Sequence, residues 1–107
     1  MLRRSPLRAA GKVYEFRWYE IKPDCFAAYG KQTAAHFRLR TQHSKLCGFW
    51  TFEVGATLNQ VFHVWEYDSL EHRRQVRSAL ASDKDWNSKY VATILPFFVR
   101  QTNALVM

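Results

Sequence analysis

The strand-like segments of this sequence carry apolar side chains on both faces, and this feature limits the folds open to the chain. In residues 13–21 (VYEFRWYEI), Tyr14, Phe16 and Trp18 share one face, and Val13, Tyr19 and Ile21 share the other, around Glu15 and Arg17. Residues 46–54 and 60–67 show the same two-sided pattern. In an antiparallel sheet with one solvent-exposed face, apolar and polar side chains alternate more regularly along each strand. We therefore expect a sheet with both faces covered.

A helix is predicted between the first two strands. Pro23 ends the first strand, and Asp24 can cap a helix over residues 25–44. The apolar stripe of this helix, at spacings of three and four residues, is Phe26, Tyr29, Thr33 and Phe37.

Residues 61–80 change from strand alternation to helical spacing near Asp68. Either Asp68 or Ser69 can cap a second helix, which we expect to end near Ala81, and Glu71 is placed to complete a capping box from Asp68. The predicted buried face is Leu70, Val76 and Leu80, with the stem of Arg73 or Arg77. A further helical piece spans residues 85–95 and is broken by Pro96, and residues 97–106 form the last strand.

The predicted order is therefore β-α-β-β-α-β, with a turn at Gly55 and Asn59 between the second and third strands. Right-handed crossovers fold this order into a ferredoxin-like α+β domain, a four-stranded antiparallel sheet with helices on one face. Two helices cover only one side of the sheet. A homodimer in which two sheets pack together would cover the other side, and a ligand could lie between them.

Charge and cysteine content restrict the class of protein. The net charge is +7, but residues 1–12 contribute +4 through Arg3, Arg4, Arg8 and Lys12, and the rest of the chain has 12 basic and 9 acidic residues. The nearly balanced body argues against nucleic-acid binding. The basic, acid-free start is typical of a mitochondrial transit peptide or its remnant, or of a disordered tail. Cys25 and Cys47 show no paired spacing and predict free thiols.

Several side chains are candidates for chemistry. His63 lies among aromatic residues and is either a base or a core histidine with one hydrogen bond. His36 and His43 lack the spacing of a metal-binding helix, so we expect no metal. Cys25, near a helix start, has no partner histidine and predicts an idle thiol.

The second helix carries a basic ridge. Its members are Arg73, Arg74 and Arg77, next to His72. A solvated face paired with Glu71 explains this ridge, and anion or phosphate binding is the alternative.

Three stretches together resemble the NipSnap family: YEFRWYEIKPDCFAAY, RLRTQHSKLCGFWTFEVG and NQVFHVWEYDSLEHRRQVRSALASDKDW. The matching positions include Gly48, Trp50, Glu53, Gly55, Asn59, Val61, His63, Trp65, Tyr67, Arg73, Arg77, Leu80 and Trp86. The resemblance implies that residues 13–107 form one domain of the dimeric α/β barrel type after a tail of residues 1–12. It also implies a mitochondrial location, with the cytosol as a second compartment, and a homodimeric adaptor role in vesicle traffic or mitochondrial quality control, without defined catalysis or cofactor.

The alternative function is a small-molecule carrier or a cofactor-independent enzyme similar to the monooxygenases of the wider fold group. Its ligand would occupy the cleft between the sheet and the helices. The pocket candidates are Trp18, His43, Trp50, His63, Trp65 and Tyr67. No apolar run reaches the length of a membrane span, so any membrane association is expected to be peripheral.

Overall fold

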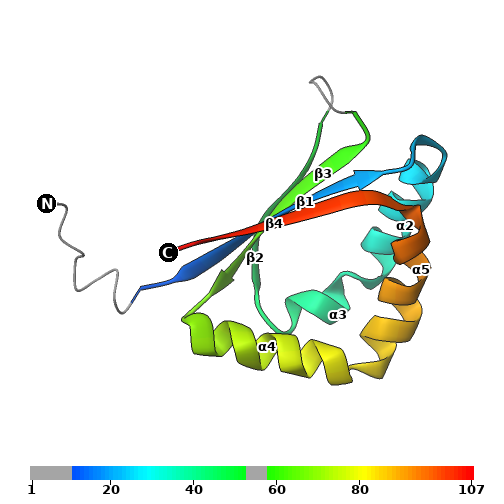
Figure 1. Ribbon diagram of the computed structural model, residues 1–107. Coiled ribbons are helices and arrows are strands. Elements are labelled where there is room, and N and C mark those ends of the chain that lie inside the picture. Colours follow the sequence, from blue (N-terminus) through cyan, green and yellow to red (C-terminus); the bar gives the residue numbers. More distant parts are fainter. Residues whose placement is uncertain (1–10, 53–57) are drawn as a thin grey trace, which may run out of the picture.

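The computed structural model describes residues 11–52 and 58–107 as a four-stranded antiparallel sheet with all helices on one of its faces (Figure 1). The strand order is β2-β3-β1-β4, with β1 in contact with both β3 and β4. The strands are β1 (Val13–Ile21), β2 (Lys45–Thr51), β3 (Gln60–Tyr67) and β4 (Phe98–Val106). The predicted order and the ferredoxin-like α+β fold are confirmed. The predicted tail lies outside the described residues, except for its last two positions.

The helical layer has two parts that follow β1 and β3 (Figure 1). The first comprises η1 (Pro23–Cys25), α2 (Phe26–His36) and α3 (Arg38–Thr41). The second comprises α4 (Leu70–Ser82), the π-helix η2 (Trp86–Val91), α5 (Ala92–Ile94) and η3 (Leu95–Phe97). No helix in these described parts combines the length and apolar composition that a membrane crossing needs.

The first helix differs from the prediction over residues 25–44, because it is shorter and is divided at Phe37. The Phe37 amide still donates to Thr33 O at 2.9 Å, but Arg40 N donates to Phe37 O in a tighter turn. Phe37 packs against both core clusters of the domain. The tight turn brings Arg40 beneath the sheet, where it is 4% exposed.

The start of α4 also differs from the prediction. Ser69 is the N-cap, and its hydroxyl accepts from His72 N at 3.0 Å. The capping box from Asp68 to Glu71 does not form, since the Glu71 carboxylate instead pairs with Arg74. Leu70 was expected to be buried but is 51% exposed, because the first turn of α4 faces it outward. Val76 and Leu80 are buried as predicted.

The link between β2 and β3 is only partly described. The predicted strand 46–54 is observed as Lys45–Thr51, and its last two positions and Gly55 lie outside the described residues. Asn59 has a φ of 60°, a left-handed conformation that asparagine tolerates, which fits its predicted turn role. A bulge between Leu46 and Gly48 shifts the register of β2 against β3.

The core lies between the sheet and the helices and is rich in aromatic rings. Tyr29, Trp65, Tyr67 and Tyr90 are almost completely buried. Each ring can bury roughly 150–250 Å², and at about 25 cal/mol per Å² this contributes several kcal/mol as an upper estimate. The aromatic core therefore stabilises a short chain in which both cysteines are free.

Candidate functional site

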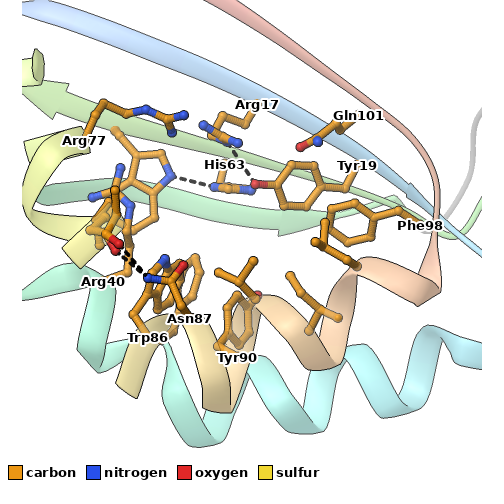
Figure 2. Close-up of a pocket in the computed structure, with 17 residues that line it drawn as sticks. Arg17, Tyr19, Arg40, His63, Arg77, Trp86, Asn87, Tyr90, Phe98 and Gln101 are labelled. Atoms are coloured by element: carbon orange, nitrogen blue, oxygen red, sulfur yellow. Dashed lines mark hydrogen bonds between the residues drawn. The ribbon is translucent and has the colours of Figure 1, made fainter. Parts of the chain in front are cut away.

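A cavity of about 320 Å³ lies between the helix-facing side of the sheet and the second helical part (Figure 2). Strands β1, β3 and β4 supply one wall, and α3, α4, η2 and α5 supply the other. Its aromatic lining consists of Tyr19, Phe37, Trp65, Trp86, Tyr90 and Phe98. Its charged and polar lining consists of Arg17, Arg40, His63, Arg77, Asn87 and Gln101.

The π-helix η2 shapes one wall of the cavity. Its wide turn places the rings of Trp86 and Tyr90 in a stack with centroids 4.6 Å apart. The Tyr90 hydroxyl is 2.9 Å from Thr33 Oγ1, which ties η2 to α2. Asn87 donates to the carbonyl oxygens of Leu80 and Asp83, both at 2.8 Å, and so closes the end of α4. This wall is held by hydrogen bonds as well as by packing.

Glu15 is a completely buried carboxylate on the helix-facing side of β1, next to the cavity. It accepts from Arg17 Nη1 at 2.8 Å, and from Arg73 Nε and the Tyr67 hydroxyl, both at 3.1 Å. Burial alone would raise the pKa of Glu15, but the bond from Arg73 and the charges of both arginines outweigh it and hold the pKa below the usual value. Glu15 is therefore ionised and orients Arg17.

Arg40 is a buried cation at the same site. Its Nη2 donates to the Tyr67 hydroxyl at 2.7 Å, and its Nη1 donates to Ser44. Its guanidinium carbon lies 3.8 Å from the centre of the Trp65 ring, a cation–π distance. Burial lowers the pKa of Arg40. Arginine nevertheless keeps its proton near neutral pH, so the cavity wall carries this positive charge.

His63 is 2% exposed, and its hydrogen bonding identifies its tautomer. Its Nδ1 accepts from Trp65 Nε1 at 2.7 Å (Figure 2). Burial, together with the charges of Arg17 and Arg40, lowers the pKa of His63 to about 3, so the ring is neutral at pH 7. A neutral ring with an accepting Nδ1 carries its proton on Nε2. This buried Nε2–H has no hydrogen-bond partner among the described residues. His63 is thus a hydrogen-bond donor at the cavity and not a ready base.

The structure divides the six predicted pocket residues among three places. His63 and Trp65 line the cavity, and Tyr67 lies beside them in the Glu15 cluster. His43 lies apart, with its Nε2 3.2 Å from Asp83 Oδ2. Trp18 and Trp50 lie on the opposite face of the sheet, where both flank Phe62. The structure therefore does not bring the two tryptophans together with His63.

The predicted basic ridge is also divided. Arg73 reaches the buried Glu15, and Arg74 pairs with Glu71 on the surface. Arg77 lines the cavity. Positions 73, 74 and 77 are neighbours on α4, but the three arginines do not form one patch, because Arg73 is drawn to Glu15 and Arg74 to Glu71.

Sequence reasoning gave Glu15, Arg17 and Arg40 no site role, although they are central to the geometry. The sequence does indicate the first two, because Glu15 and Arg17 lie on the same face of β1 as Tyr19, and that face is otherwise apolar. Charged residues on a face buried by helices must be paired, so they mark a polar site. Arg40 gave no such signal, because its burial depends on the turn at Phe37.

Neither a metal site nor an activated thiol is indicated by the residues that the structure describes. Residues 11–52 and 58–107 contain no group of three side chains that could hold a metal ion. Partial burial and the neighbouring Asp24 carboxylate raise the pKa of the Cys25 thiol, so this thiol is not activated.

The fold and the cavity define a ferredoxin-like α+β domain with a polar, aromatic-walled pocket beneath its helices. The NIPSNAP family model matches residues 14–107. NipSnap homolog 3B of Mus musculus is 41% identical over 97 residues, which cover 91% of this chain and 39% of that protein. The chain belongs to the NipSnap family. It spans about two fifths of the length of the NipSnap homologs 3A and 3B that it matches.

Two solved structures place the fold in context. A NIPSNAP domain protein from Burkholderia xenovorans has a TM-score of 0.82 and 30% identity, covering 89% of this chain and 92% of that one. A putative antibiotic biosynthesis monooxygenase from Nitrosomonas europaea has a TM-score of 0.66 and 9% identity, covering 91% and 89%. At this identity the second likeness concerns the fold alone.

Proposed function

We propose that the domain functions as a homodimer in which the outer face of the sheet packs on the same face of a second copy. One observation carries this proposal, an aromatic patch on the side of the sheet away from the helices. The patch consists of Phe16, Trp18, Trp50 and Phe62. The Phe62 ring lies 5.1 Å from the Trp18 ring and 5.5 Å from the Trp50 ring, and both pairs are stacked. A contiguous apolar patch of this kind favours association.

One ring of the patch, that of Trp50, lies against the backbone of β2. A Cβ atom added at Gly48 would lie 2.2 Å from Cη2 of Trp50, so the indole lies directly over the glycine. Trp50 is nevertheless 51% exposed, which leaves one face of its ring free to contact another molecule. A two-fold axis would let each copy present the same surface to the other.

Sedimentation tests the homodimer. We expect a dimer at micromolar concentration, and we expect Phe62→Glu to give a monomer because it buries an unpaired charge in the interface. Leu70→Glu is the control, since Leu70 is as exposed as Trp50 of the patch but lies on α4. A monomeric wild type would contradict the proposal, and so would dissociation by both variants.

We further propose that this homodimer is a mitochondrial adaptor that binds other proteins in vesicle traffic or mitochondrial quality control, with the cytosol as a second location. Membership of the NipSnap family and the basic residues 1–12 support this role. Affinity capture from mitochondrial extract should recover the same proteins with wild type and Leu70→Glu, and fewer with Phe62→Glu. Equal recovery by the folded Phe62→Glu monomer would show that the dimer is not needed.

A second candidate function is binding of a small organic molecule, by a carrier or a monooxygenase-like enzyme. The observation that favours it is the cavity with the unpartnered donor of His63. The four tryptophans give a direct test, because Trp65 and Trp86 line the cavity while Trp18 and Trp50 lie on the other face. A ligand of the cavity should shift the indole N–H NMR signals of the first pair alone. If flat organic compounds never do so, this candidate fails.

A further inference from the structure

The cavity has more positive than negative charge. Arg17, Arg40 and Arg77 line it. Among residues 11–52 and 58–107, the one carboxylate that forms an ion pair with any of these three arginines is Glu15, which bonds to Arg17. Glu15 also forms an ion pair with Arg73, so its single negative charge is shared between two cations. Charges in a poorly solvated cavity interact more strongly than charges in water, and this excess of positive charge favours an anion.

The burial of Arg40 makes this excess of positive charge unfavourable for folding. Its partners Tyr67 and Ser44 are neutral hydroxyls, and no ion pair to it is found in the described parts of the chain. A buried cation without a counter-charge destabilises a fold unless a partner of opposite sign reaches it. The guanidinium is fixed against the Trp65 ring, so it is already positioned for such a partner.

The donors of the cavity come from different elements and are directed at the same space. Figure 2 shows the guanidinium groups of Arg17 and Arg77 pointing toward one another above His63. Glu15 offsets only part of this positive charge because it also pairs with Arg73, so an anion between Arg17 and Arg77 would lower their repulsion. The buried Nε2–H of His63 supplies a neutral donor beside them, aligned by the bond from Trp65.

We propose that this cavity binds a small organic anion, a flat apolar body that carries one carboxylate or phosphate group. The inference rests on the second candidate function and specifies its ligand. Arg77, Arg17 and His63 would hold the anionic group, because planar guanidinium groups match carboxylate and phosphate oxygens. The rings of Trp86, Tyr90 and Phe98 would enclose the flat body.

Calorimetric titration with three probes of the same shape tests the proposal: 2-naphthoate, 2-naphthyl phosphate and the neutral 2-naphthamide. We expect at least one anion to bind about ten times or more tightly than the amide, the usual scale of a charge-assisted hydrogen bond. The anion that binds more tightly identifies the group. Its binding should shift the indole N–H signals of Trp65 and Trp86 and leave those of Trp18 and Trp50 in place.

Arg77→Gln locates the anionic group, because Arg77 is exposed enough for the fold to tolerate its loss. We expect it to weaken binding of the preferred anion about tenfold and to leave amide binding unchanged. Arg74→Gln is the matched control on the same helix, since Arg74 pairs with Glu71 outside the cavity, and it should bind like the wild type.

The outcomes separate the two ideas. Equal binding of the anions and the amide, with shifts at Trp65 and Trp86, would overturn the anion inference and leave the second candidate function standing. An equal effect of Arg74→Gln and Arg77→Gln would also overturn the inference, because only general surface charge would then matter. If none of the three probes binds, the inference fails together with the second candidate function.

Discussion

Acid should destabilise this domain through His63. The ring is buried and its Nδ1 accepts from Trp65 Nε1, so protonation of Nδ1 would break that bond. It would also add a positive charge near Arg17 and Arg40, which already lower the pKa of His63. The folded state therefore disfavours the charged ring, and the unfolded chain accepts the proton more readily.

The sign and size of the effect follow from the two pKa values. The folded pKa of His63 is lowered to about 3, and the unfolded value is near 6.5. The stability that neutral His63 provides is complete above the unfolded pKa and is lost as the pH falls from 6.5 toward 3. Between pH 7 and pH 5, the unfolded state gains most of one proton, so the free energy of unfolding should fall by about 2 kcal/mol through this group.

Urea unfolding at pH 7, 6 and 5 measures this loss, with His63→Gln and His63→Phe for comparison. Each variant removes the titrating ring, so each should lose about 2 kcal/mol less than the wild type over this range, whatever its stability at pH 7. The difference between proteins cancels the contributions of the remaining titrating groups. Parallel losses in the wild type and both variants would refute the assignment of a neutral, buried His63.

Three further variants test other parts of the structure by urea unfolding at pH 7. Glu15→Gln should cost about 3–5 kcal/mol, because it leaves Arg17 without its buried counter-charge, and a cost below 1 kcal/mol would contradict the ionised cluster. Gly48→Ala should destabilise the fold by displacing the Trp50 indole, and adding Trp50→Ala should recover part of that loss; additive losses would contradict the contact. Ser69→Ala should cost about 1 kcal/mol as a lost N-cap, whereas Asp68→Ala should cost less, and the reverse order would favour the capping box.

The sequence specifies the elements of this fold better than their junctions. Strand 60–67 is observed with its predicted bounds, because its run of β-branched and aromatic residues is bounded by Asn59 and Asp68. The break at Phe37 was not predicted, since local spacing continues the helix through it and only packing against two clusters ends it. The prediction that Leu70 is a core residue was wrong for a similar reason, because the periodicity of a sequence does not give the angle at which a helix packs on the sheet.

The candidate site shows the same limit. His63 and Trp65 were predicted as pocket residues from their common parity, and they do line one cavity. The aromatic character of Trp18 and Trp50 also predicts a pocket role, although Trp18 lies on the opposite face of β1 from Arg17 and Tyr19. The sequence shows which residues of one strand share a face. The pairing between strands is needed to decide which faces of neighbouring strands lie on the same side of the sheet.

The two faces of the sheet therefore suggest separate roles. The outer face is aromatic and uncharged at its centre, which suits a second protein surface. The inner face carries the buried Glu15 on β1 and the buried His63 on β3, with the partly buried Arg17 opposite His63, where apolar residues would pack at lower cost. A chain of this length has few buried positions to give to charged groups. Its retention of a cationic cluster beside a cavity is best explained by a ligand that compensates the charge, whereas dimerisation through the outer face would leave that charge unchanged.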